Sequence, residues 1–269
     1  SQSKEYVSKF LEIQKIVNPD IIEIHNRPIY VEQLVQLKSN LVLYFHNDPI
    51  SMIGSKSVNE RVNLLAICSK IIFNSEWSKK QFLKNLKNFY HKSKKLEVIH
   101  QSTIKKKINL NKKENLITFV GKLNSAKGYD IFGDAIVKIL DKYPKWKSLV
   151  IGDEPREQIN VIHKNLRNLG FQNHQKVLQT FEKSSIAVAC SRWEEPFGRT
   201  SLEAASRGCA VIISNRGGLP ETITNGIILR NLKPKTLFEA IDNLIKDKHK
   251  LKNLQKDSIK NFYLTDNLI

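Results

Sequence analysis

The sequence predicts an α/β protein in which two parallel sheets follow one another along the chain. Short runs rich in Ile, Val and Leu alternate with stretches of helical periodicity, and this alternation is typical of strand, helix, strand units. The 269 residues are enough for two domains, and a hydrophobic content of 41% is enough for a core in each. No apolar run approaches the roughly 18 residues that a membrane-spanning helix needs.

Four apolar runs predict the first sheet. Its strands are expected at 21–25, 41–46, 70–74 and 96–100, with helices between them. The stretch that follows, 101–115, is rich in lysine and asparagine and has only three apolar residues. We therefore expect it to link two domains.

Six further runs predict the second sheet. They lie at 116–120, 148–152, 165–170, 186–190, 210–214 and 226–229, and the tail 233–269 has the apolar spacing of two helices. The expected domains are 1–107 and 108–248, followed by a C-terminal helix at 249–269 that crosses back to the first domain. Parallel sheets bind ligands at the carboxyl ends of their strands, so the chemistry is expected in the loops after the strands.

The charge of the chain narrows the choice of partner. Its net charge is +18, and residues 79–113 hold twelve lysines against the single acid Glu97. Such a face favours phosphate-rich partners, namely anionic lipid, nucleic acid or nucleotide-linked metabolites, although a solvated lysine face without a partner explains it equally well.

The cysteines and the first residues bear on location. Cys68, Cys190 and Cys209 lie far apart, each in or beside an apolar stretch, and they are expected to be buried and reduced. The first apolar residues are interleaved with charge, unlike those of a signal peptide. We expect a cytoplasmic protein.

The loop after the strand at 186–190 has the strongest functional pattern. Glu195 precedes a helix that is expected to begin near Gly198, and Glu203 lies just over one turn inside that helix. The first amides of a helix have no intrahelical acceptor and face the positive end of its dipole, so they favour a phosphate. Carboxylates on both sides of that phosphate can accept hydrogen bonds from sugar hydroxyls.

Two more loops have residues suited to a diphosphate. Gly121 follows a strand and permits close approach of the backbone, while Lys122 and Lys127 supply positive charge before the next helix. Gly217 and Gly218 follow another strand, where an ordinary turn is the alternative.

Together these loops resemble the donor-binding domain of the family 4 retaining glycosyltransferases (glycosyl transferases group 1). The resemblance rests on EPFGRTSLEAASRG, on AVIISNRGGLPE and on FVGKLNSAKGYD, and it covers 116–245, with a looser likeness over 20–100. It implies the GT-B fold, in which two Rossmann-like domains face a cleft. No strand and glycine-rich loop of the family precede Asp20, so the first domain is expected to be shortened and incomplete at its start.

The resemblance also implies roles for residues of this chain. Lys127 contacts the donor diphosphate, Lys122 stands where the family usually has arginine, Glu195 holds hydroxyls of the donor sugar, and Glu203 holds the ribose. The amides of Phe197, Gly198, Arg199 and Thr200 meet sugar and phosphate, and Gly121 lies against the diphosphate. His46, which ends the strand 41–46, faces the donor sugar. His46, Lys127 and Glu195 are thus the implied catalytic residues.

The resemblance implies a metal-independent, retaining transfer of a sugar to a hydroxyl of a glycan, lipopolysaccharide or glycolipid. The resemblance implies a UDP- or GDP-sugar as substrate, no cofactor and no metal. One alternative is a nucleotide-sugar-binding module without transfer activity, which the short first domain favours. A weaker alternative is a basic nucleic-acid-binding protein, but its aromatic residues are not interleaved with lysines, and we expect no nucleic-acid partner.

A basic amphipathic helix is expected at 75–90. Phe82, Leu83, Leu86 and Phe89 would share one face, flanked by lysines. Such a helix either packs on the sheet with its lysines in solvent or draws the protein to an anionic membrane surface. The second possibility predicts peripheral attachment to the inner face of the membrane.

Overall fold

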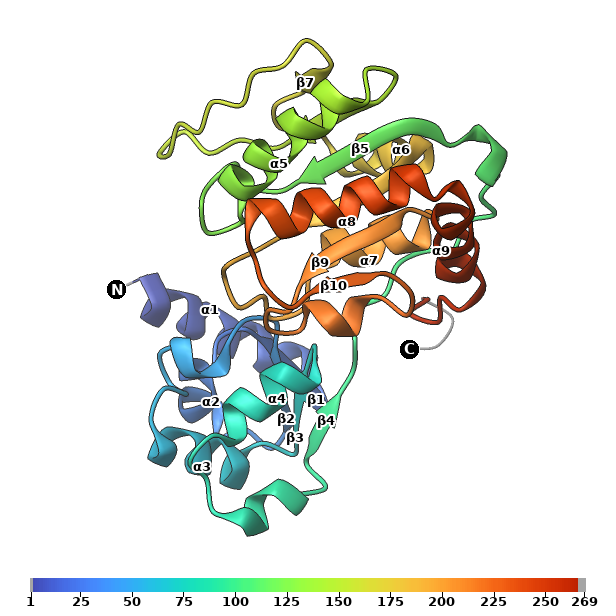
Figure 1. Ribbon diagram of the computed structural model, residues 1–269. Coiled ribbons are helices and arrows are strands. Elements are labelled where there is room, and N and C mark those ends of the chain that lie inside the picture. Colours follow the sequence, from blue (N-terminus) through green and yellow to red (C-terminus); the bar gives the residue numbers. More distant parts are fainter. Residues whose placement is uncertain (1, 266–269) are drawn as a thin grey trace. The chain divides into compact units, whose positions relative to one another are not determined.

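The computed structural model describes residues 2–265, which form two α/β units (Figure 1). The first unit extends to His100 and the second begins at Gln101, earlier than the boundary expected after Lys107. The predicted linker belongs to the second unit, because the Lys113 ammonium donates to the carbonyls of Phe181, Ser184 and Arg207 at 2.7–2.8 Å. Its last residues already form the first strand of that unit.

The first unit has one sheet of parallel strands in the order β1-β2-β3-β4. The strands are β1 (Ile21–His25), β2 (Asn40–Phe45), β3 (Lys70–Phe73) and β4 (Leu96–Val98), close to the predicted positions. The helices are α1 (Gln2–Val17), α2 (Ile29–Leu34), α3 (Val58–Ile67) and α4 (Glu76–Leu83), with short 3-10 turns η1 (Pro49–Ser51) and η2 (Asn88–Lys92).

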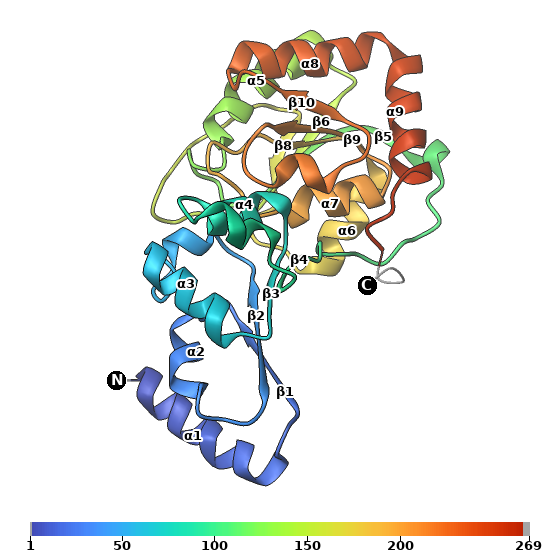
Figure 2. The same cartoon turned by 90° about the horizontal axis from the view of Figure 1, so that it is seen from below.

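These helices cover one face of the first sheet (Figure 2). Alternate strand residues, such as Ile22 and Ile24 of β1 and Leu43 and Phe45 of β2, are buried in one apolar cluster with residues of all four helices. The intervening residues of β1 are exposed. The opposite face of the sheet therefore presents Glu23 and His25.

The predicted single helix over 75–90 is wrong. Helix α4 ends at Leu83, and Asn85 takes the left-handed conformation with φ of 64°, which asparagine tolerates better than most residues. The chain then returns Leu86 to the core and continues into η2. Phe89, expected on the apolar face, is 62% exposed.

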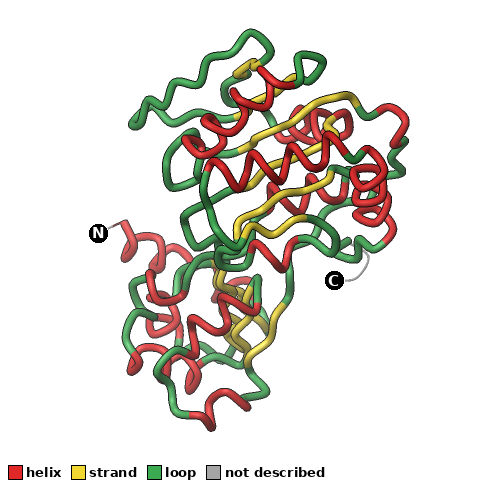
Figure 3. Tube along the Cα trace, in the orientation of Figure 1, coloured by secondary structure: helices red, strands yellow, loops and turns green. Residues whose placement is uncertain are grey.

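The second unit has a larger sheet, whose strands are drawn in yellow in Figure 3. All its strands are parallel, and their order is β10-β9-β8-β5-β6-β7. Its strands are β5 (Glu114–Val120), β6 (Lys147–Ile151), β7 (Leu166–Asn168), β8 (Ser184–Ala189), β9 (Ala210–Ser214) and β10 (Ile227–Leu229). Its helices are α5 (Tyr129–Lys142), α6 (His174–Lys183), α7 (Arg199–Ser206), α8 (Pro234–Lys246) and α9 (Lys248–Lys260), with the turns η3 (Leu110–Lys112) and η4 (Leu219–Thr222).

Both faces of this sheet are covered. Ile117 and Val188 pack with residues of α5 and α8 on one face, whereas Ala187 and Val211 pack with residues of α6 and α7 on the other (Figure 2). Strands that are buried on both faces explain the continuous apolar runs in the sequence. The three cysteines are buried and free, as their apolar surroundings predicted.

Helix α9 packs against α7, α8 and β9 of the second unit. It continues the predicted helical tail, and the chain after it runs through Phe262 and Leu264, which are buried in the α6 and α7 side of the core. The helix expected over 249–269 is too long, because α9 ends at Lys260. Residues 266–269 lie outside the described residues.

Candidate functional site

The loop after β8 is the centre of the candidate site in the second unit. Three groups of this loop, the Ser191 hydroxyl and the amides of Arg192 and Trp193, donate to the carbonyl of Ala126 at 2.9–3.1 Å. The Arg192 guanidinium also makes a two-point contact with Asp130 at 2.6 and 2.5 Å. These bonds fix the loop before α5 to the loop before α7.

That attachment brings Lys127 and Glu195 together. The Lys127 ammonium lies 2.5 Å from the Glu195 carboxylate, and their side chains are 33% and 13% exposed. Gly128 makes this approach possible: its φ is 73°, and a Cβ there would lie 1.9 Å from the Cys190 carbonyl oxygen. The structure thus joins the expected diphosphate lysine to the expected sugar carboxylate.

The loop after β9 holds the backbone of Glu195 from the other side. The Gly218 amide donates to the Glu195 carbonyl at 2.7 Å, and a Cβ on Gly217 would lie 2.1 Å from that oxygen. Glu194 accepts from the Gly217 amide at 2.6 Å and from Arg216 at 3.0 Å. Close packing against the carboxylate loop therefore requires glycine at position 217.

Helix α7 begins directly after this contact. Gly198, with φ of 120°, precedes the helix, and a Cβ there would lie 2.5 Å from Leu219. The Phe197 ring is buried in the core, so only its backbone can meet a ligand. The amides of Arg199 and Thr200 belong to the first helical turn and have no acceptor within the helix.

Glu203 is buried on the same helix. It is 5% exposed, whereas an ordinary acid of a first helical turn would be solvated. Its carboxylate accepts from His174 Nε2 at 2.9 Å and from the Arg199 guanidinium at 3.1 and 3.3 Å. Two largely exposed donors thus orient a buried carboxylate.

The remaining residues of the diphosphate loop lie after β5. Gly121 has φ of 154° and approaches Gly152 so closely that a Cβ on Gly152 would lie 1.8 Å from the Gly121 carbonyl oxygen. Lys122 is exposed. Hydrogen bonds from Arg156 are the main cause that lowers the pKa of Glu154 to about 2, and the charge of Lys122 contributes a smaller part.

His46 lies in the first unit, after β2. Its amide donates to the Asn26 side chain at 3.0 Å, and its carbonyl accepts from Asn74 at 2.9 Å, so the backbone of this strand end is fixed. Its Nε2 lies 2.9 Å from His25 Nδ1. Partial burial, and secondarily the charge of His25, lower the pKa of His46.

Sequence reasoning missed His174 and the Arg192 to Asp130 contact. No spacing indicated them, because His174 reaches Glu203 from another helix and Asp130 reads as an ordinary first-turn acid. Within residues 2–265, no group of three His, Cys, Asp or Glu side chains is placed to hold a metal ion.

The chain resembles known proteins over most of its length. It is 26% identical to spore coat protein SA of Bacillus subtilis, over 89% of this chain and 72% of that protein. It is 28% identical to an uncharacterised glycosyltransferase of Methanocaldococcus jannaschii, over 80% of this chain and 56% of that protein. The crystal structure of Anabaena HepE with UDP-glucose has a TM-score of 0.75 at 18% identity, covering 96% of this chain and 78% of that one.

The structural likeness confirms the predicted α/β fold with two Rossmann-like units, which is the GT-B fold. Residues 100–261 match the family described as Glycosyl transferases group 1, and this segment is more than half of the chain. It contains every loop of the candidate site in the second unit. The chain therefore belongs to the glycosyl transferases group 1 family.

Proposed function

We propose that this protein is a retaining glycosyltransferase that moves a sugar from a nucleotide-sugar to a hydroxyl acceptor. Family membership supports glycosyl transfer in general. The observation that carries the finer proposal is the Lys127 to Glu195 contact beside the start of α7, because it puts a cation, a carboxylate and helix amides around one small volume.

The carboxylates are proposed to hold the two sugars of the donor. Glu203 accepts hydrogen bonds from the ribose hydroxyls, since His174 and Arg199 already fix its orientation. Glu195 accepts from hydroxyls of the transferred sugar through the oxygen that Lys127 does not occupy. Both glutamates position the donor, and neither acts as a nucleophile.

Lys127 is proposed to neutralise the diphosphate. An ammonium has three N–H donors, so one can remain on Glu195 while the others meet phosphate oxygens. The amides of Gly198, Arg199 and Thr200 add partial positive charge, the Phe197 amide completes that turn, and Gly121 permits close approach. Lys122 plays a lesser part. With these groups in place, the reaction needs no metal.

In the proposed step, the bond between the anomeric carbon and the phosphate oxygen breaks while a bond to the acceptor oxygen forms on the same face. The acceptor proton passes to the departing phosphate, so the configuration is retained. Charge develops on the leaving phosphate, and preorganised donors such as Lys127 stabilise it. His46 of the first unit is proposed to hydrogen-bond the donor sugar.

The donor is proposed to be a UDP- or GDP-sugar and the acceptor a glycan, a lipopolysaccharide or a glycolipid. The UDP-glucose in the HepE complex supports the first assignment. A binding module without transfer activity is the rival. Incubation with a panel of UDP- and GDP-sugars separates the two. An enzyme releases nucleotide, and this release continues in EDTA, whereas a module binds free nucleotide without turnover.

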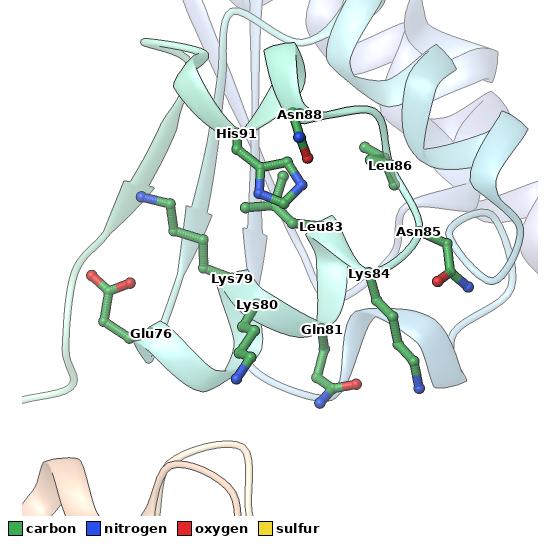
Figure 4. Close-up of a pocket in the computed structure, with 10 residues that line it drawn as sticks. All are labelled: Glu76, Lys79, Lys80, Gln81, Leu83, Lys84, Asn85, Leu86, Asn88 and His91. Atoms are coloured by element: carbon green, nitrogen blue, oxygen red, sulfur yellow. The ribbon is translucent and has the colours of Figure 1, made fainter.

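We also propose that the first unit attaches peripherally to an anionic membrane. Among residues 2–265 no helix is long and apolar enough to cross a bilayer. Lys79, Lys80, Lys84 and His91 line a shallow pocket of about 480 Å³ on α4 and η2. Figure 4 shows Lys80 and Lys84 extending in the same direction from this helix. Each lysine near an anionic surface contributes about 1 kcal/mol.

Sedimentation with vesicles tests the attachment. Binding to vesicles that contain anionic lipid, lost in raised salt and reduced in Lys80→Gln/Lys84→Gln, is expected. Lys248→Gln/Lys252→Gln on α9 is the matched control for charge. Equal binding to neutral vesicles, or none to either, contradicts the proposal and leaves a solvated lysine face.

A further inference from the structure

The first unit holds a chain of three titratable side chains, of which the proposed function uses only His46. His46 Nε2 lies 2.9 Å from His25 Nδ1, and His25 Nε2 lies 3.2 Å from the Glu23 carboxylate. The two imidazoles stack with ring centroids 5.2 Å apart and an interplanar angle of 10°. Glu23 and His25 belong to the exposed face of β1, and His46 follows the neighbouring strand.

The surrounding structure holds His46 in this chain. The centroids of the Tyr44 and His46 rings lie 4.3 Å apart, and the Tyr44 hydroxyl donates to the Ile99 carbonyl at 2.7 Å. Asn26, with φ of 58°, accepts from the His46 amide. Side-chain contacts and backbone bonds thus fix both the ring and its strand end.

The order of donors and acceptors along the chain determines where the protons lie. An ionised carboxylate only accepts hydrogen bonds, so His25 carries its proton on Nε2 and donates it in a hydrogen bond to Glu23. A neutral His25 then has a lone pair on Nδ1, and His46 must donate to it from Nε2. The remaining nitrogen of His46, Nδ1, is left as an acceptor.

One added proton reverses this arrangement. When His25 carries protons on both nitrogens, its Nδ1 donates to His46 Nε2, which must then be unprotonated. A neutral His46 now carries its proton on Nδ1. Its outward hydrogen bond changes from accepting to donating, without a change in the charge of His46 itself.

We propose that Glu23 and His25 are positioning residues that set the tautomer of His46, so that His46 Nδ1 accepts a hydrogen bond from a ligand hydroxyl until the chain takes up a proton. That the ligand is the donor sugar rests on the proposed function. The tautomer itself does not, because it follows from the three side chains alone.

The other titratable side chains near His46 do not set its tautomer. Tyr44, whose pKa burial raises, stays a neutral hydroxyl on the Ile99 carbonyl. Asp48, two residues after His46, accepts from the Ile50 amide within its own turn. Burial, and secondarily the charge of His25, lower the pKa of His46.

The test is a pH titration of the full chain labelled with 15N-histidine, since ring nitrogen shifts distinguish protonated from unprotonated sites. The seven histidines are assigned with single His→Gln variants. The wild type should show two protonation steps. His46 should be protonated on Nε2 at pH values above both steps and on Nδ1 at pH values between them. An isolated histidine has no neutral state in which Nδ1 protonation dominates.

Two variants and one control complete the test. Glu23→Gln should move the first step to lower pH by about half a unit, the size of an exposed ion-pair effect. His25→Phe should leave a single step for His46. Glu97→Gln, which removes an equally exposed carboxylate paired with Lys70 at 3.0 Å, should change neither.

A single step for His46 in the wild type, or a first step that Glu23→Gln leaves in place, overturns the proposal. Transfer assays separate this from the proposed function. Titration as expected, with an acid limb of kcat/KM for the donor that follows the first step and shifts in Glu23→Gln, supports both. If the histidines titrate as expected but the protein binds nucleotide without turnover, only the proposed transfer is contradicted.

Discussion

At the scale of single residues, Glu195 before α7 and Glu203 on α7 differ in how they are held. Glu203 is fixed by His174 and Arg199, while Glu195 is fixed by Lys127 and by the backbone of the loop after β9. Different partners suit different ligand groups. We therefore expect Glu203 to bind the nucleotide and Glu195 to bind the transferred sugar.

Replacing each glutamate tests that separation. Glu203→Gln should weaken binding of free nucleotide by roughly 10- to 100-fold, because a charged acceptor contributes about 1.5 to 3 kcal/mol. Glu195→Gln should leave that affinity within a few-fold and reduce transfer. Calorimetry with UDP and GDP measures the first effect. Equal loss of nucleotide affinity in both variants would show that the division of roles is wrong.

The lysines of the diphosphate loop should also differ. Lys127 is a third exposed and contacts Glu195, whereas Lys122 is solvated near Glu154. Lys127→Ala is expected to lower kcat by about 100-fold, the usual effect of removing one preorganised donor, and Lys122→Ala by much less. Steady-state kinetics at saturating donor measures both. Wild-type turnover in Lys127→Ala would remove this lysine from the mechanism.

At the scale of elements, the site depends on how closely the loops pack. Gly217→Ala would place a Cβ 2.1 Å from the Glu195 carbonyl, whereas Gly170→Ala has nothing within 4 Å. Both glycines have positive φ, 57° and 63°, so both substitutions cost about 1 kcal/mol in backbone strain. Only Gly217→Ala should also lose transfer activity. Thermal unfolding and kinetics of the two variants, compared side by side, decide whether displacement of Glu195 matters.

The Arg192 to Asp130 contact should hold the Lys127 loop. Hydrogen bonds from Arg192 lower the pKa of Asp130, so the contact stabilises the fold above the ordinary carboxyl range and loses that effect as pH falls through the folded-state pKa. Arg192→Met should reduce transfer at neutral pH and flatten the dependence of melting temperature on pH between about 5 and 3. Arg156→Met, which breaks the Arg156 to Glu154 pair instead, is the control for transfer. Unchanged transfer in Arg192→Met would mean that backbone bonds alone hold the loop.

At the scale of the whole molecule, the sequence predicts the strands better than the helices. Apolar runs located every strand to within a few residues, because strands buried in a parallel sheet tolerate few polar residues. Helical periodicity failed at 75–90, where Asn85 breaks a pattern that continues in the apolar residues. Helix α1 was not expected, since its exposed Ile13, Ile16 and Val17 weaken an amphipathic pattern.

The site was predictable where a motif lies within one loop and not where residues meet across loops. Glu195, Gly198 and Glu203 share one stretch of sequence. The Lys127 to Glu195 contact depends on how two loops are attached through the Ala126 carbonyl, and the His25 to His46 contact depends on the register of β1 and β2. Such contacts follow from sheet order, which composition and periodicity do not contain.

The central claim is transfer with retention, and proton NMR of the sugar released early in the reaction tests it most directly. Wild type and Glu195→Gln are incubated with an α-linked UDP- or GDP-sugar, with water as the acceptor of last resort, and the anomeric signals are followed before mutarotation. The account predicts that the α anomer appears first in the wild type and far more slowly in the variant. Initial release of the β anomer, or nucleotide binding without any sugar release across the donor panel, would contradict it.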